Sequence, residues 1–244
     1  MSQLTRSAPC PGALADSSGF TLIELLVAMV SGLIVSLAAF ALLELGTNLA
    51  GQVDDRIDSA TSGGVAMTAI VQDLQSSCIT PATSPIQSSL PLPSGANSLV
   101  FWSSVGGQAT VTPVLHAIAL TAGTLTDTRY ALISGTTPST WTFSSTGTAT
   151  RLAANISEVS GTPVFQYFAY NSSTGEVSTT NLAPSANLTT AQATTVLAVT
   201  VTFSAAPYST STLSTRATRQ TVLTRRVGLR LSPLGSTGAN VACS

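Results

Sequence analysis

The sequence predicts an α+β protein, in which a long N-terminal helix, transmembrane and then amphipathic, packs on a C-terminal antiparallel β-sheet domain. The helix is predicted because residues 25–43 carry no charge, and because apolar residues then recur every three or four positions to about residue 74. The sheet is predicted because short runs from residue 97 onward are rich in aromatic and β-branched residues, two of them alternating.

The composition limits the classes of function. Charged residues make up 8% of the 244 residues, against about 25% in an ordinary soluble domain. There is no Lys, and the net charge is −1, so no global positive field points to nucleic acid. Ser and Thr are frequent after residue 80, but 44% of the residues are hydrophobic, which is too many for a disordered Ser/Thr tract.

The uncharged segment 25–43 has the length of a membrane anchor. Its 19 residues span about 28 Å as a helix, close to a hydrocarbon core of roughly 30 Å. A signal-peptide core has about 7 to 15 apolar residues, and no small-x-small cleavage site follows here, so the sequence predicts a retained anchor. Arg6 precedes the anchor, and Asp54, Asp55 and Asp58 follow it, which predicts a cytoplasmic N-terminus.

Glu24 is a carboxylate at the start of this apolar segment. A charge costs roughly 2.5 to 3.5 kcal/mol at the bilayer centre, and less near the interface. Two interpretations follow from the residue itself. Glu24 lies at the interface in the first helical turn, where a negative charge suits the helix dipole, or it pairs inside the membrane with a positive group such as the amino terminus of another subunit.

The six residues Gly19-Phe20-Thr21-Leu22-Ile23-Glu24 resemble the processing site of type IV prepilins and type II secretion pseudopilins. The resemblance implies that a prepilin peptidase cuts after Gly19 and methylates the new N-terminal Phe20. It also implies that Glu24, the fifth residue after the cut, neutralises the amino terminus of a neighbouring subunit as helices assemble. The leader departs from the family pattern, because it holds only Arg6 against Asp16.

The helix is predicted to continue beyond the membrane. Its first half is expected to form the membrane stem and filament core, and its second half to lay its apolar face on the globular domain. Its apolar positions are Leu45, Leu49, Val53, Ile57, Ala60, Met67, Ile70, Val71 and Leu74. Gly63-Gly64 interrupts this spacing, at a cost of about 1 kcal/mol per Gly relative to Ala, and predicts a bend or local break. Pro81 and Pro85 prevent further continuation.

Six segments are predicted to form strands, namely 98–105, 116–120, 129–135, 163–170, 194–204 and 221–232. In 194–204, Leu197, Val199, Val201 and Phe203 alternate with small or polar residues, which predicts one buried face. In 221–232, Arg225 interrupts the apolar side and is predicted to lie at a strand end or on an edge strand.

From the helix end to the last Arg-rich strand, the order of segments resembles PilW-like minor pilins and J-type pseudopilins. Removing 19 residues from 244 leaves 225, a size that suits a minor subunit. The expected layout is a leader (1–19), a transmembrane helix and stem (20–45), an amphipathic continuation (46–80), a Pro/Ser-rich linker (81–96) and an extracytoplasmic β-rich domain (97–244).

The resemblance implies a minor pilin or pseudopilin subunit of a type IV pilus or type II secretion-like filament. Its partners would be prepilin peptidase, other pilin or pseudopilin subunits, an inner-membrane assembly platform and membrane lipid. It would be a single-pass protein of the cytoplasmic membrane, with its N-terminus inside and its globular domain outside, before it enters a cell-surface filament.

The cysteines leave two alternatives. Loss of the leader removes Cys10, so Cys78 and Cys243 remain, an even pair in a compartment where disulfides persist. They form a bridge from the helix end to the C-terminus, or they stay as two unpaired thiols.

Enzymatic chemistry is not expected. His116 is the only His and lies in the apolar run VLHAIAL, as a core or edge His rather than a catalytic base. The sequence holds no G-x-S-x-G, C-x-x-C or H-E-x-x-H motif and no Gly-rich phosphate loop. We interpret the cluster Asp54, Asp55 and Asp58 as a solvated helix face, because a calcium site needs more oxygen ligands. No cofactor or metal is expected.

The alternative function is a membrane-anchored or filament-tip binding module, either an adhesin or a DNA-uptake receptor. Five arginines gather near the C-terminus, Arg216, Arg219, Arg225, Arg226 and Arg230. They would contact phosphates in a DNA receptor, or they are ordinary strand-surface charge, so nucleic acid is a partner that the composition does not support.

Overall fold

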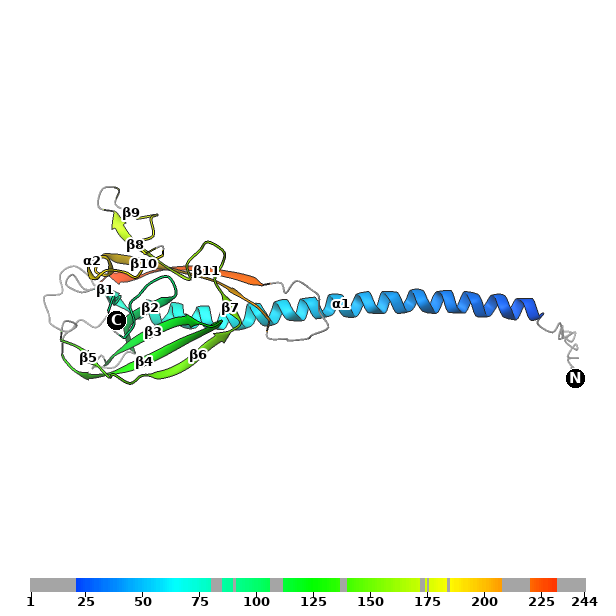
Figure 1. Ribbon diagram of the computed structural model, residues 1–244, viewed down its shortest axis with the longest axis horizontal. Coiled ribbons are helices and arrows are strands. Elements are labelled where there is room, and N and C mark those ends of the chain that lie inside the picture. Colours follow the sequence, from blue (N-terminus) through cyan, green and yellow to red (C-terminus); the bar gives the residue numbers. More distant parts are fainter. Residues whose placement is uncertain are drawn as a thin grey trace, which may run out of the picture. The chain divides into compact units, whose positions relative to one another are not determined.

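A computed structural model describes residues 21–79, 85–89, 91–105, 112–136, 140–171, 174, 176–183, 185–207 and 220–231. Over these residues the chain is α+β, as predicted (Figure 1). It divides into two compact units, residues 1–50 and 51–244. The helices are α1 (Leu22–Gln75) and α2 (Thr190–Ala193).

The first described unit consists of the N-terminal part of α1. Thr21 caps this helix, because its side-chain Oγ1 accepts a hydrogen bond from the Glu24 backbone N–H at 3.3 Å. The helix is long and apolar enough to cross a membrane, and residues 21–50 are all exposed. Since an apolar surface of this extent is unfavourable in water, it needs lipid or another protein around it.

In the second unit, the remainder of α1 packs into the core along the stripe Ser59, Gly63, Ala66, Met67, Ile70 and Leu74. The expected break at Gly63-Gly64 does not occur, since α1 continues to Gln75. Gly63 serves close packing, because a Cβ there would lie 3.0 Å from the Cβ of Ala205 and closer still to Leu223. Val53 and Ile57, which precede the Gly pair and were expected in the stem, are exposed.

One antiparallel sheet has the order β2-β3-β4-β5, and β6 pairs with β4. Its strands are β2 (Ser98–Val105), β3 (Thr112–Thr121), β4 (Thr124–Ser134), β5 (Thr142–Phe143) and β6 (Thr148–Ala154). The β3–β4 turn has positive φ at both central residues, 47° at Ala122 and 76° at Gly123. This is the backbone pattern of a type I′ hairpin, and it fixes which residues of the two strands face each other.

The other large sheet has the order β11-β10-β8-β9, with β7 paired to β10. Its strands are β7 (Ile156–Ser157), β8 (Phe165–Asn171), β9 (Glu176–Val177), β10 (Val196–Ala205) and β11 (Thr221–Gly228). Arg225 lies on β11, the edge strand, as predicted. A separate parallel pair joins β1 (Cys78–Ile79) to β12 (Arg230–Leu231).

The predicted single buried face of 194–204 is wrong in two respects. A register shift between Val196 and Ala198 brings Val196 rather than Leu197 into the core. The opposite face is also buried, since Thr200, Thr202 and Ser204 are at most 8% exposed. β10 is a central strand, and side chains of its neighbours cover its polar residues, as in the hydrogen bond between Ser204 and Gln220.

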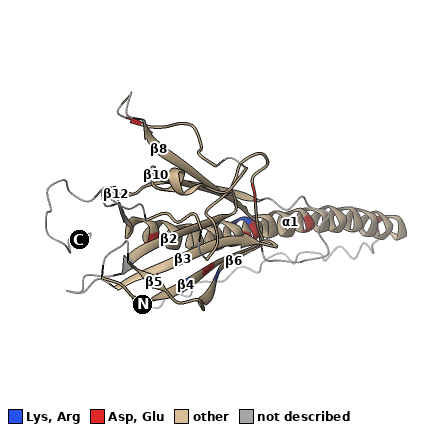
Figure 2. Cartoon of the chain, turned by 60° about the vertical axis from the view of Figure 1, so that its left-hand side comes forward, with Lys and Arg blue, Asp and Glu red and all other residues tan. Residues whose placement is uncertain are grey.

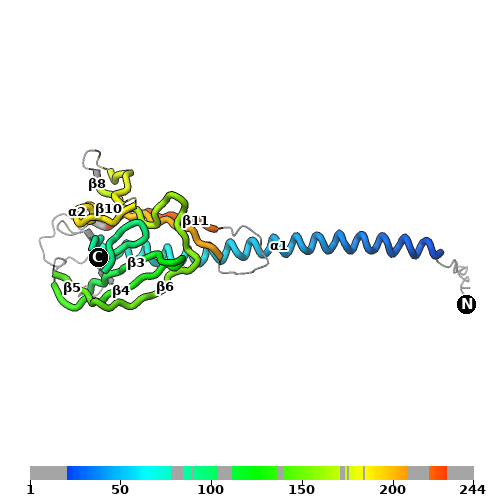
Figure 3. The backbone as a smooth tube through the Cα atoms, in the orientation of Figure 1, coloured from blue at the N-terminus to red at the C-terminus, as the bar shows by residue number. Residues whose placement is uncertain are grey.

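The core of the second unit lies between the two large sheets, with the last turns of α1 between them (Figures 1 and 3). Within the segment expected as a linker, Ile86 is buried and bridges Phe101 of β2. The Tyr167 hydroxyl of β8 donates towards the backbone carbonyls of Gly95, at 3.1 Å, and Ser98, at 2.6 Å. These hydrogen bonds connect the start of β2 and the segment before it to the sheet that contains β8.

Candidate functional site

The residues of the predicted processing motif lie partly outside the described residues. Gly19 and Phe20 are among those that the structure does not describe. Glu24 lies in the first turn of α1 and is exposed. Thr21 and Glu24 therefore occupy the first and last positions of an S/T-x-x-E capping sequence, of which the bond from the Glu24 backbone N–H to the Thr21 side chain is formed.

An apolar stripe on α1 extends well beyond one membrane thickness. Leu45, Leu49, Val53 and Ile57 recur every four residues along one face, and their side chains are 53–58% exposed. From Leu25 to Ile57 the helix has 33 residues, about 50 Å at 1.5 Å per residue. Because a hydrocarbon core is roughly 30 Å thick, lipid that covers residues 25–43 cannot also cover these four side chains.

Cys78 is placed by its backbone alone. Strand β1 sets Cys78 beside Arg230 of β12, thirteen positions before Cys243 in the sequence. Cys243 lies outside the described residues, so the disulfide stays a prediction.

A buried polar cluster surrounds His116 on the sheet face that meets α1. The His116 Nδ1 lies 3.1 Å from Asp127 Oδ2, and its Nε2 lies 3.0 Å from the Ser103 hydroxyl. Arg129 donates from Nε to Asp127 at 2.8 Å and from Nη2 to Asp73 of α1 at 3.4 Å. The His116 ring stacks on Phe101 at 5.1 Å between centroids. The cluster therefore ties α1 to strands β2, β3 and β4.

The two carboxylates of this cluster have opposite pKa shifts. Burial raises the pKa of Asp73, and the nearby His116 and Arg129 offset this only in part. Burial also acts to raise the pKa of Asp127, but hydrogen bonds from His116 and Arg129 outweigh it, so the pKa of Asp127 lies below its ordinary value. Asp127 is thus the ionised centre of the cluster.

The chain of Ser103, His116 and Asp127 has the order of a nucleophile, a base and an orienting carboxylate. Ser103 and Asp127 are 0% exposed and His116 is 1% exposed, so no substrate reaches the hydroxyl in this conformation. The oxygen and nitrogen atoms of Asp73, His116 and Asp127 also lie within 4.8 Å of one another, a spacing suited to a metal. Arg129 already supplies the positive charge there, which favours a structural ion-pair network.

The sequence prediction placed His116 in the core but missed the four polar residues that form the cluster with it, Asp73, Ser103, Asp127 and Arg129. The signal that could have found Asp127 and Arg129 is Gly123, because a two-residue turn at Ala122-Gly123 places His116 opposite Arg129 and Ile118 opposite Asp127.

The other charged candidates do not converge on a ligand. Among the described residues, Asp54, Asp55 and Asp58 belong to no metal-spaced group. Arg226 lies 4.6 Å from the centroid of the Phe168 ring and donates to the carbonyl of Ser178, so it is engaged on the sheet surface. Arg216 and Arg219 lie outside the described residues, and only the backbone of Arg230 is described. Charged side chains are sparse over both sheets (Figure 2).

Comparison with known proteins gives no relative: no model of a protein family matches the chain, and no curated protein is significantly similar to it.

Proposed function

We propose that this chain is a minor pilin-like or pseudopilin-like subunit of a type IV pilus or type II secretion-like filament. In this proposal, prepilin peptidase cleaves the Gly19–Phe20 bond and methylates Phe20. The mature helix stays in the cytoplasmic membrane, with the globular domain outside, until an assembly platform adds the subunit to the filament. The partners are other pilin or pseudopilin subunits, and the protein itself performs no chemistry.

The observation that carries the proposal is the exposed apolar stripe of Leu45, Leu49, Val53 and Ile57. Burying one such side chain contributes roughly 1.5 to 3 kcal/mol, so leaving the stripe in water forgoes several kcal/mol. Lipid covers only about 30 Å of the helix. A simple membrane anchor has no need of apolar residues past that length, whereas a helix that packs against other helices in a filament does.

Glu24 supports the same proposal. Its side chain is exposed on a helix surface that is otherwise apolar, and an ionised carboxylate in that setting gains most from a fixed positive partner. The amino terminus created at Phe20 in a neighbouring subunit is such a partner, and pairing with it favours one registry between helices.

The test is assembly of Glu24→Ala in cells that carry the filament machinery, with Glu44→Ala at the other end of the apolar segment as the matched control. We expect Glu24→Ala to accumulate in membranes but to be lost from sheared filaments and from subunit cross-links. We expect Glu44→Ala to assemble normally. A triple change of Leu49, Val53 and Ile57 to Ser should also abolish assembly while leaving membrane insertion intact.

The alternative of an anchored surface receptor predicts a different result. Glu24→Ala and the triple Ser variant would then behave as the unmodified protein, with equal surface exposure and no cross-links to other subunits in any of the variants. That pattern would remove the filament proposal.

A further inference from the structure

The sheet that contains β2, β3 and β4 carries a row of large side chains on the face opposite α1. Trp102 faces Leu115 in the β2–β3 pairing, and Leu115 faces Tyr130 in the β3–β4 pairing. Their chain neighbours Phe101, His116 and Arg129 belong to the other face, where the buried charge cluster lies, because side chains alternate along a strand. The row therefore lies outside the core that α1 shares.

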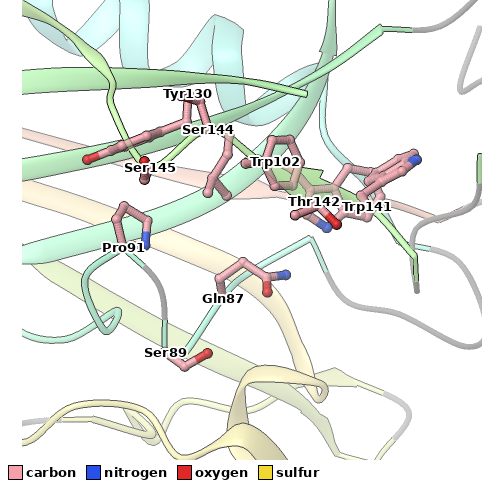
Figure 4. A pocket seen from close by; sticks show the side chains of 11 residues that line it. Gln87, Ser89, Pro91, Trp102, Tyr130, Trp141, Thr142, Ser144 and Ser145 are labelled. Carbon is pink, nitrogen blue, oxygen red and sulfur yellow. The ribbon is translucent and has the colours of Figure 1, made fainter. Parts of the chain in front are cut away.

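Two segments at the edges of this sheet turn the row into a pocket (Figure 4). At the β4 edge, Trp141 packs edge-on against Trp102 at 4.7 Å between ring centroids, and Phe143 lies 6.5 Å from Trp141. At the β2 edge, the segment from Pro85 follows β2, with the Gln87 N–H bonded to the Val100 carbonyl at 2.8 Å. The pocket is partly open to solvent and has a volume of about 520 Å³, within the size range of small-molecule sites.

The lining is aromatic and polar but carries no charge. The hydrogen-bonding side chains of the lining are those of Gln87, Ser89, Tyr130, Thr142, Ser144 and Ser145. No Asp, Glu, Lys, Arg or His is among the described lining residues. An ionised ligand would lose hydration without gaining a counter-charge, so the lining disfavours phosphates, carboxylates and nucleic acid.

We propose that this pocket binds a neutral saccharide. A sugar ring presents apolar C–H groups on its faces, which pack on aromatic rings, and hydroxyls around its rim, which need neutral donors and acceptors. Tyr130 and Trp141 are half-buried and supply the rings, while Trp102 is buried and packs against Trp141. The exposed residues Ser89, Thr142 and Ser145 supply hydroxyl partners for the rim. The site goes beyond the filament role and does not depend on it.

A proline-rich peptide is the competing ligand, since such peptides also dock on aromatic grooves. A polyproline helix fills such a groove mainly with apolar rings. The five neutral polar side chains around the Trp102 and Trp141 rings favour a ligand with many hydroxyls instead.

The protein carries its own probe, because both of its Trp residues, Trp102 and Trp141, line the pocket. The full chain, in a zwitterionic detergent without a sugar headgroup, is screened on an array of neutral and anionic oligosaccharides. Each neutral oligosaccharide that is retained is then titrated by Trp fluorescence. We expect retention of neutral glycans and a saturable fluorescence change.

Three variants test whether the pocket is the site. Trp141→Ala removes one wall and should weaken binding on the array at least about ten-fold. Ser145→Arg, at an exposed position of the rim, should block the pocket with no loss of core packing. This variant still tests the pocket if Trp141→Ala fails to fold. Tyr170→Ala is the control, because Tyr170 is an exposed aromatic residue of β8 that does not line the pocket.

The saccharide assignment would be overturned by retention of only anionic glycans, by retention of no neutral glycan at millimolar concentration, or by saturable binding of proline-rich peptides instead. If Ser145→Arg binds the glycan with unchanged affinity, the glycan does not bind in this pocket.

Discussion

At the scale of single residues, Asp127 holds the buried cluster together. It is fully buried and accepts hydrogen bonds from His116 and Arg129, whereas Asp73 is partly exposed. Asp127→Asn leaves the Arg129 guanidinium without its main partner and should destabilise the protein by about 2 to 4 kcal/mol. Asp73→Asn should change stability by less than about 1 kcal/mol, because ionised Asp73 is already disfavoured by burial. Thermal unfolding of the full chain in detergent measures both.

The same pair predicts how stability depends on pH. The pKa of Asp127 is lowered, so its contribution is present above its ordinary value of 3.8 and is lost as pH falls through the lower folded value. The pKa of Asp73 is raised, so its ionisation lowers stability at neutral pH, and this loss is relieved as pH falls through its folded value. When the pH is lowered below about 3.8, the free energy of unfolding of Asp127→Asn should therefore fall by less than that of the unmodified protein. Equal losses would contradict this assignment.

The sequence predicted the role of Glu24 but not the buried cluster around His116. Glu24 was found because six consecutive residues form a local motif, and Thr21 belongs to the same motif. Asp127 and Arg129 were not found, because their place beside His116 depends on a register set by Ala122 and Gly123, and a two-residue turn gives a weak signal in a chain rich in Gly, Ser and Thr.

At the scale of elements, Gly63 and Gly64 form a natural pair for a packing test. A side chain at Gly63 would meet Ala205 and Leu223, whereas at Gly64 it would meet nothing within 4 Å. Gly63→Leu should destabilise the protein by about 1 to 3 kcal/mol through overpacking. Gly64→Leu should be neutral or stabilise it by up to about 1 kcal/mol through helix propensity. Thermal unfolding compares them, and equal effects would show that α1 does not approach β10 and β11 this closely.

The strands show which elements a sequence predicts well. Segment 98–105 was predicted with the bounds that β2 has, because its aromatic and β-branched residues are flanked by turn residues. The short strands β5, β7 and β9 were missed, since two residues carry no periodicity, and the seven-residue strand β6 was missed as well. The polar face of β10 was expected in solvent, but the sequence alone does not show that β8 and β11 cover Thr200 and Thr202 on both sides.

At the scale of the whole molecule, the α+β class followed from one apolar run and several short alternating runs. The same apolar spacing runs through both halves of the helix, yet Val53 and Ile57, expected in the stem, are exposed. An apolar helix face is the same sequence signal whether its partner lies in the same chain or in another. The chain alone buries only the later stripe from Ser59 to Leu74.

The central claim is that the chain is processed and assembled as a filament subunit, and the N-terminal mass of the protein from native membranes tests it most directly. We predict a chain that begins at Phe20 and carries one added methyl group. A chain that retains residues 1–19 in cells with an active prepilin peptidase would contradict it, and with it the proposed pairing of Glu24 with a neighbouring amino terminus.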